Sequence, residues 1–262
     1  MNLHWFDEVS GLKPEKTDAM MAEIGHMPPV PIILMILVGL GCVVAWYGGG
    51  LVARRRLDHR LARGTAGHGV LALTYDDGPG RRATPELLDL LARLDVRATF
   101  FVIGRSASEG TDLVDRIVGE GHTLGWHTER HRNQWKTDPI RGILDLAVNP
   151  VVATRQPDRC LLFRPPYGKM TLGTVLVARL RQWTIATWTH VSGDTHGSLP
   201  DPDDVVAAVE ESGGGVVLMH DMDRTDPARG DFVLQTTEAL VALARRKAWT
   251  IVAAPEEWRA LA

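Results

Sequence analysis

Two histidines and a pair of aspartates are the residues of this 262-residue chain whose types and spacing could do metal chemistry. His127 and His131 are four residues apart, which on a helical turn puts both imidazoles on one face, where they can share one cation. Asp77 is a candidate third ligand, because three protein ligands and a water molecule form the open arrangement of catalytic zinc sites. Its neighbour Asp76 has different electrostatic surroundings and is left free to act as a general base. A tight turn would explain the glycine and proline that follow, but not the doubled carboxylate.

These residues lie in a chain of alternating strands and helices. After Gly64, short apolar and β-branched runs alternate with longer amphipathic stretches, which is typical of βαβ units and a parallel sheet. The predicted strands are 70–75, 98–103, 122–125, 161–163, 184–188, 216–219 and 250–253. The predicted helices are 85–94, 106–120, 139–154, 172–182, 203–212 and 236–247. The alternation fits either a barrel or an open doubly wound sheet, and both place chemistry at the carboxyl ends of the strands.

Reactive side chains follow five of these predicted strands. In chain order they are Asp76 and Asp77, His127 and His131, Arg164, Asp194, and His220. Because the carboxyl ends of parallel strands meet at one edge of the sheet, these five groups should collect on one rim. The sequence therefore predicts a single site there.

The same residues form the motifs of a known family. They are Thr74-Tyr75-Asp76-Asp77-Gly78-Pro79, His127-Thr128-x-x-His131, Arg164-Pro165-Pro166-Tyr167-Gly168 and Leu218-Met219-His220, in that order. Over about residues 69–254 the chain resembles the NodB-type polysaccharide deacetylases, carbohydrate esterase family four. The resemblance implies a distorted (β/α) barrel with seven strands. It also implies a divalent-metal hydrolase that removes acetyl groups from N-acetylated sugars and releases acetate.

The resemblance assigns a metal and a base to this sequence. It implies that Asp77, His127 and His131 hold the cation, with zinc favoured and cobalt, nickel or manganese as alternatives. It implies that Asp76 is the general base and that Arg164 holds and tunes this carboxylate.

The resemblance also assigns the acid and the substrate pocket. His220 would be the general acid, and Leu218 would line the pocket for the acetyl methyl group. Pro166 is a further candidate substrate-binding residue. The backbone N–H of Tyr167 would help to bind the oxyanion. Asp194 would orient either the motif arginine or the acid histidine.

The chain departs from the usual family pattern in the fourth motif. The family usually has a tryptophan directly after the motif aspartate, where this chain has Thr195, and another aspartate three residues before it, where this chain has Val191. Both departures bear on the geometry of the sugar pocket. Trp135, in a polar loop after the histidine pair, is the candidate for stacking on a sugar.

An apolar segment precedes the alternating region. The 24 residues from Val30 to Ala53 carry no charge, and about 20 residues suffice for a helix to cross the hydrocarbon core of a bilayer. The run is longer than the core of a signal peptide and lacks its basic leader and cleavage motif, so it predicts a transmembrane anchor. The expected organisation is a polar tail 1–27, the anchor 28–53, a basic linker 54–68 and a catalytic domain 69–262.

The side of the membrane is left open by the sequence. Five arginines lie between positions 54 and 63, against Lys13 and Lys16 before the apolar segment, which favours a cytoplasmic catalytic domain. Analogy with cell-wall deacetylases favours the external side. A cytoplasmic site would instead remove an acetyl or formyl group from a polyprenyl-linked sugar. A second alternative is a membrane-tethered sugar-binding module without turnover, which would need no pair of base and acid.

The composition argues against two other classes. Lys and Arg total 29 against 32 Asp and Glu, and the positive charge is concentrated in the short stretch after the apolar segment. We therefore expect no nucleic-acid partner. Cys42 and Cys160 lie far apart, one of them in the apolar run, so no disulfide framework is expected.

Overall fold

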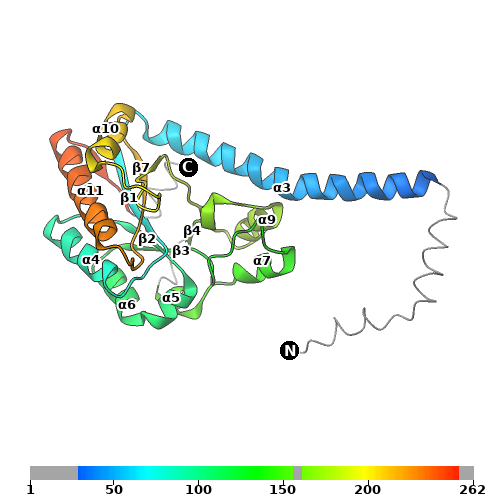
Figure 1. The fold of residues 1–262 in the computed structure, drawn as a ribbon, viewed down its shortest axis with the longest axis horizontal. Coiled ribbons are helices and arrows are strands. Elements are labelled where there is room, and N and C mark those ends of the chain that lie inside the picture. The colour runs from blue at the N-terminus through cyan, green and yellow to red at the C-terminus, as the bar shows by residue number, and fades with distance from the viewer. Residues whose placement is uncertain (1–28, 156–160, 254–262) are drawn as a thin grey trace. The chain divides into compact units, whose positions relative to one another are not determined.

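The computed structural model describes residues 29–155 and 161–253, so the predicted tail 1–27 and Cys160 lie outside the described residues. The chain divides into two compact units, Met1–Ala45 and Trp46–Ala262. Helix α3 (Pro29–Thr65) begins in the first unit and ends in the second (Figure 1). Its most apolar window has a mean hydropathy of 2.2 and exposed side chains, so it is long and apolar enough to cross a membrane. A helix of this kind near the N-terminus serves either as an anchor or as a signal sequence.

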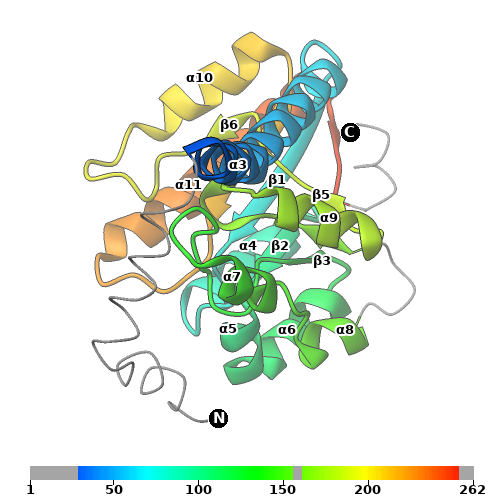
Figure 2. The same ribbon diagram turned by 90° about the vertical axis from the view of Figure 1, so that its right-hand side faces the viewer.

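A curled parallel sheet forms the centre of the second unit (Figures 1 and 2). In the described residues its strands are β1 (Val70–Asp76), β2 (Thr99–Val102), β3 (Thr123–Trp126), β4 (Leu162–Phe163), β5 (Thr184–Ile185), β6 (His190–Val191), β7 (Gly215–His220) and β8 (Thr250–Ile251). Their order is β5-β4-β3-β2-β1-β7-β6, and β8 pairs with the start of β1. The predicted α/β fold with a parallel sheet is confirmed.

The two outer strands of the sheet, β5 and β6, follow each other directly in the sequence. Four residues separate them, and a link of that length spans at most roughly 18 Å. The segment pairs first with β4, where Ala186 N–H donates to Phe163 O (2.8 Å), and then with β7, where Ser192 N–H donates to Leu218 O (3.0 Å). The sheet therefore curls like a barrel and is not an open doubly wound sheet. The single strand predicted at 184–188 is shorter than expected, and β6 was not predicted.

Helices flank the curled sheet (Figure 2). They are α4 (Ala83–Arg93), α5 (Gly104–Glu109), α6 (Thr111–Gly119), α7 (Pro139–Asp145), α8 (Pro150–Arg155), α9 (Leu172–Leu180), α10 (Pro202–Ser212) and α11 (Pro227–Arg246). All six predicted helical regions are present, but the regions 106–120 and 139–154 are each two helices. The first breaks at Gly110 (φ −122°, ψ 44°), and the second restarts where Asn149 Oδ1 accepts from Val151 N–H. Helix α11 begins earlier than predicted, because Asp226 caps it and a proline occupies its first turn.

Side chains alternate between the two faces of β1. Leu71, Leu73 and Tyr75 belong to the large core that the sheet shares with its helices, whereas Ala72 belongs to a smaller cluster inside the curl. The same period of two directs Asp76 to the inside. Because β1 and β7 are in parallel register, Asp76 lies directly opposite His220. The inner face of the sheet thus carries reactive groups at its carboxyl end.

The last part of α3 belongs to the barrel. Leu61 is 2% exposed and packs in the inner cluster with Ala72 and Ala186. Closer to the carboxyl ends of the strands, the Arg54 guanidinium lies 4.2 Å from the ring of Trp188, in the link between β5 and β6. Residues 54–65, which the sequence suggested as a linker, are thus helical and packed against the curled sheet.

We expect Leu61→Ala to lower the free energy of unfolding by about 2 to 5 kcal/mol, because it leaves a cavity inside the curled sheet. The matched control Leu180→Ala changes a side chain that is 84% exposed and should shift stability by less than about 0.5 kcal/mol. Denaturant unfolding of the two variants beside the parent chain measures the difference. Equal stability of both variants would mean that α3 does not pack into the barrel.

Candidate functional site

The carboxyl end of β1 presents two carboxylates in different surroundings. Asp76 is the last residue of the strand and is buried, and its Oδ1 accepts a hydrogen bond from Arg164 (2.8 Å). Asp77 follows with φ 72°, a left-handed conformation that aspartate tolerates better than most residues. Of the two adjacent aspartates, Asp76 is therefore paired with an arginine and Asp77 is turned toward the histidines.

The two histidines lie on a loop rather than on a helix. Strand β3 ends at Trp126, and Thr128 and His131 have φ values of 69° and 53°. The predicted helical turn is therefore wrong, although the ring centroids of His127 and His131 are 4.9 Å apart. Thr128 Oγ1 accepts from the backbone N–H of His131 (3.0 Å), which fixes the loop from within. The loop thus brings the imidazoles together as the spacing suggested, by a different backbone path.

A buried carboxylate holds this loop from outside. Asp145, in α7, accepts from the backbone N–H groups of Arg130 (2.9 Å) and Arg132 (3.1 Å). Asp145 is the last residue of α7, at the point where the predicted helix 139–154 is interrupted. The split helix is therefore part of what positions the site.

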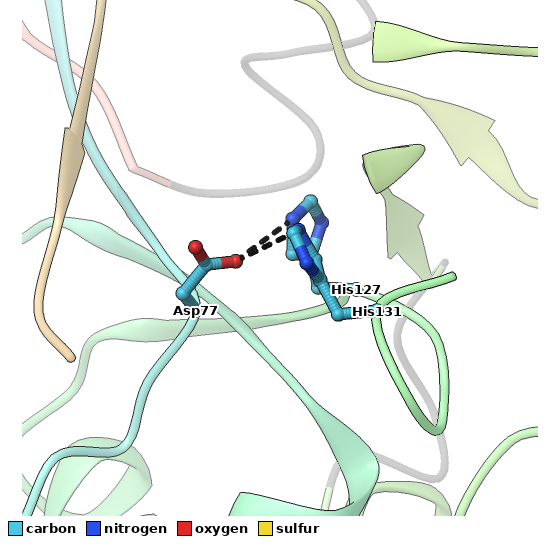
Figure 3. Close-up of side chains that lie close together, drawn as sticks. All are labelled: Asp77, His127 and His131. Carbon is cyan, nitrogen blue, oxygen red and sulfur yellow. Dashed lines mark ion pairs between the residues drawn. The ribbon is translucent and has the colours of Figure 1, made fainter. Parts of the chain in front are cut away.

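The side chains of Asp77, His127 and His131 converge on one point (Figure 3). Asp77 Oδ1 lies 3.0 Å from His131 Nε2 and 3.3 Å from His127 Nε2, and the ligand atoms all lie within 4.8 Å of one another. Asp77 Oδ1 is buried and has no hydrogen-bond partner among the described residues. His127 Nδ1 donates to Arg164 O (2.7 Å), so its neutral ring presents the Nε2 lone pair to the cluster. One carboxylate and two imidazoles of this geometry fit a divalent metal ion.

The charges of the cluster suit a metal site. Burial disfavours the charged form of Asp77, but the neighbouring imidazoles outweigh it and lower its pKa to about 2. Burial, aided by the charge of His127, lowers the pKa of His131 in spite of the nearby carboxylates. An ionised carboxylate and neutral imidazoles are the forms that bind a cation.

Arg164 is fully buried beside Asp76. Besides its bond to that carboxylate, it donates to Thr74 Oγ1 (2.7 Å) and Thr187 O (3.1 Å). Its guanidinium also lies 4.0 Å from the centroid of the Phe101 ring. Arg164 thus binds Asp76 Oδ1, whereas the other carboxylate oxygen, Oδ2, lies 3.7 Å from His127 Nε2.

Asp194 pairs with His220 rather than with Arg164, which decides between the two partners that the sequence left open. Its Oδ1 lies 3.0 Å from His220 Nδ1, and its Oδ2 accepts from the His220 backbone N–H (3.1 Å). Burial works against a charged imidazole, but the bond to Asp194 and the charges of Asp194, Asp76 and Asp77 raise the pKa of His220. The carboxylates around His220 therefore favour its charged form, and the imidazole lies directly opposite Asp76.

The predicted substrate-side residues lie on several elements. Leu218 is buried on β7, two residues before His220 and on the same inner face. Pro166 is buried in a short 3₁₀ turn (Pro166–Gly168), in which Tyr167 has φ 56°. The Tyr167 side chain is 59% exposed and its ring lies 4.7 Å from that of His131. Tyr167 and the Asp77, His127 and His131 cluster are therefore neighbours.

Trp135 is partly engaged by the protein itself. Its indole N–H donates to Met170 O (2.7 Å), and its ring meets Tyr47 of α3 edge-on at 6.2 Å between centroids. Lys169 Nζ lies 4.5 Å from the ring centroid. These contacts hold the indole between α3 and the loop after β4.

Two site residues were missed by the sequence analysis. Thr74 binds Arg164 and lies two residues before Asp76, so the period of the strand could have placed it on the same face. Asp221 follows His220, is buried, and accepts from Thr84 Oγ1 (2.6 Å). Burial raises the pKa of Asp221 to about 7. No spacing rule distinguishes such a buried aspartate from a solvated loop residue.

Known proteins share this sequence and architecture. The sequence model of the family described as polysaccharide deacetylase matches residues 63–186. A chitooligosaccharide deacetylase of Sinorhizobium fredii is 32% identical over 175 residues, which cover 64% of this chain and 80% of that protein. A peptidoglycan-N-acetylglucosamine deacetylase of Bacillus cereus is 36% identical over 138 residues, which cover 48% of each chain. The structure of a family 4 carbohydrate esterase from Streptomyces lividans in complex with acetate matches with a TM-score of 0.60 and 27% identity, covering 72% of this chain and 93% of that one.

These matches differ in how much of each protein they include. The chain spans about half the length of the Bacillus cereus relative. The family match contains Asp77, both clustered histidines and Arg164, whereas His220 lies beyond its end. The structural match extends over most of the esterase and thereby supports the curled fold as a whole.

Replacing a cluster ligand should remove bound metal. We expect Asp77→Asn and His131→Gln each to weaken metal affinity by at least roughly 10- to 100-fold. Mutation of a residue that only hydrogen-bonds a metal ligand already costs that much, and these substitutions remove a ligand itself. Elemental analysis after equilibration with limiting Zn²⁺ measures the bound ion. His190→Gln is the matched control, since His190 bonds Thr189 and Ser212 outside the cluster. Full retention of metal in both ligand variants would contradict the site.

Proposed function

Because this chain belongs to the polysaccharide deacetylase family, we propose that it is a metal-dependent hydrolase that removes the acetyl group from an N-acetylated sugar of a glycan. The products are acetate and a free amino sugar. The observation that carries the proposal is the arrangement of the inner rim: the Asp77, His127 and His131 cluster lies beside the buried Asp76, and His220, paired with Asp194, lies directly opposite Asp76. A module that only binds sugar needs no such pair of base and acid.

Asp76 is the proposed general base. Its Oδ1 is held by Arg164, so Oδ2 remains to accept the proton of the attacking water. A divalent cation at the cluster supplies Lewis acidity to the water and to the acetyl carbonyl when it is bound. The ion pair with Arg164 places a positive charge beside this buried carboxylate and fixes its orientation.

His220 is the proposed general acid. Asp194 holds its Nδ1, which leaves Nε2 to donate a proton to the departing amine as the carbon–nitrogen bond breaks. We assign the backbone N–H of Tyr167 to the oxyanion, where one well-aimed donor contributes roughly 3 kcal/mol to the barrier. The neighbouring Leu218 offers apolar surface for the acetyl methyl group, and the buried Pro166 shapes the loop.

The substrate class follows from the relatives. The matched proteins are named for peptidoglycan N-acetylglucosamine and for chitooligosaccharides, and we propose N-acetylglucosamine units as the substrate. This chain differs from the usual family pattern at two exposed positions. Val191, on β6, is 45% exposed, and Thr195 follows Asp194. Neither position offers the carboxylate or the indole usual in the family. We infer that sugar contacts on this side of the site are weaker, and assign sugar stacking to Trp135.

Zinc is the proposed metal, because two imidazoles and one carboxylate match its preference. Cobalt, nickel and manganese accept the same ligands, so metal analysis of the purified chain decides between them.

Helix α3 is the proposed membrane anchor, through residues 30–53. The arginines that follow its apolar part favour a catalytic domain on the cytoplasmic face, where a polyprenyl-linked sugar is the alternative substrate. The peptidoglycan-directed relatives favour the external face. A reporter fused to the C-terminus that is active on only one side of the membrane separates these two substrates.

Substitution of the proposed base, Asp76, tests the activity. We expect Asp76→Asn to retain metal but to lower the rate of acetate release by roughly 10²- to 10⁴-fold, because the water proton loses its acceptor. Acetate detection on N-acetylglucosamine oligomers, together with metal analysis, measures both quantities. An active parent chain and an equally active Asp76→Asn variant would refute the base assignment, and an inactive parent chain loaded with metal would refute the function.

The acid is tested by the pH profile. Asp194 raises the pKa of His220, so the imidazole keeps its proton to higher pH, and activity falls as the pH rises through that pKa. Asp194→Asn removes this support, and we expect the alkaline limb of the kcat profile to move to lower pH. An alkaline limb that stays in place, with metal content unchanged, would mean that His220 is not the acid.

A further inference from the structure

An apolar groove lies outside the candidate active site, between the second half of α3 and α9. It has a volume of about 680 Å³ and lies wholly within the Trp46–Ala262 unit. Val52 and Leu57 of α3 and Val175 of α9 form part of its wall. These apolar side chains offer contacts to a hydrocarbon chain.

The groove is bordered by cations. Arg56 and Arg60 of α3 and Arg179 of α9 line it, and no lining residue is acidic. Arg56 and Arg60 also line a second hollow together with His59 and Arg63, again without a carboxylate.

These arginines differ from their neighbour Arg54, which forms an ion pair with Asp58 at 2.8 Å. Among the described residues, the side chains of Arg56, Arg60 and Arg179 have no hydrogen bond or ion pair. Three unpaired guanidinium groups around one hollow attract an anion, and a phosphate is the group that arginine binds best in a forked geometry.

Apolar side chains next to the groove are exposed. On α9, Leu176 is 47% and Leu180 is 84% exposed, and on the facing part of α3, Leu51 is 38% exposed. Exposed leucines beside arginines are typical of a surface that meets a bilayer. A free phosphate would make no use of this apolar surface.

We propose that the groove binds an anionic phospholipid of the bilayer, with its phosphate between Arg56 and Arg60 and one acyl chain along Val52 and Val175. The proposal concerns a site separate from the rim of β1 and β7 and does not depend on deacetylase activity. The bound lipid would hold the base of α3 and the catalytic unit at the membrane surface.

The test uses the full chain in a neutral maltoside detergent, with binding measured by native mass spectrometry and thermal shift. Dihexanoyl phosphatidylglycerol should bind and raise the Tm, whereas dihexanoyl phosphatidylcholine and inorganic phosphate should do so weakly. The double variant Arg56→Gln/Arg60→Gln should weaken phosphatidylglycerol binding at least roughly tenfold. Arg55→Gln/Arg181→Gln is the matched control, because both residues are exposed on the same two segments and neither lines the groove.

A second variant tests the apolar wall. Val52→Trp fills the groove from a position that is 48% exposed, so it should weaken phosphatidylglycerol binding without disturbing the fold. If both double variants lost phosphatidylglycerol binding equally, the binding would depend only on the overall positive charge of this surface, and the proposed site would be overturned. Equal binding of inorganic phosphate would overturn the acyl contact, and preferential binding of a polyprenyl phosphate would replace the proposed occupant. Unchanged binding in Val52→Trp would also contradict the groove.

Discussion

The parallel pairing of β1 with its neighbours is the constraint on which the candidate site depends. Its register sets Asp76 opposite His220, and the alternation of side chains turns both to the inner face of the curl. A slip of one residue would direct Asp76 into the outer core. A second parallel pair repeats the arrangement, because Arg164 N–H donates to Trp126 O (2.9 Å) and so sets Arg164 beside His127. The proposed base Asp76, the proposed acid His220, the cluster residue His127 and Arg164 are thus positioned by backbone hydrogen bonds between the strands and the residues that follow them.

Charge compensation distinguishes the supporting residues from the reactive ones. Arg164 is paired with Asp76, and Asp194 with His220, and such buried pairs are costly to break because the remaining charge has no partner. Asp77 Oδ1 is the exception at the cluster, since it is buried and receives no hydrogen bond from the described residues. Burying a charged oxygen without a hydrogen bond is costly, and a cation bound between this carboxylate and the two imidazoles would compensate that cost. The arrangement therefore carries a structural reason for binding metal.

The long strands and the order of the motifs were predictable, because β1 and β7 are continuous apolar runs ending in reactive residues. The short strand β6 was not, since two residues of an edge strand carry no periodic signal, and it continues the same extended segment as β5. The His127–His131 spacing suggested a helix, whereas positive φ at Thr128 and His131 is decided by contacts from α7 that come from outside the loop. The partner of Asp194 also required the structure, because only the pairing of β6 with β7 brings it to His220.

The part of helix α3 that belongs to the Trp46–Ala262 unit packs into that unit. Its Leu61 fills the inner cluster, Gly50 lies against the backbone of Met170 where no side chain would fit, and Arg54 reaches Gly168 O at 3.4 Å. Gly168 follows Tyr167, so the helix touches the turn that carries the proposed oxyanion donor. The arginines alone suggested a linker, because a cluster of like charges after an apolar run has no visible packing partner in the sequence. Since Arg54 is paired with Asp58 and covered by Trp188, it serves the fold, whereas Arg56 and Arg60, which have no partner among the described residues, are available to an external anion. Within one short run of arginines, one side chain thus packs inside the fold and others lie on the surface.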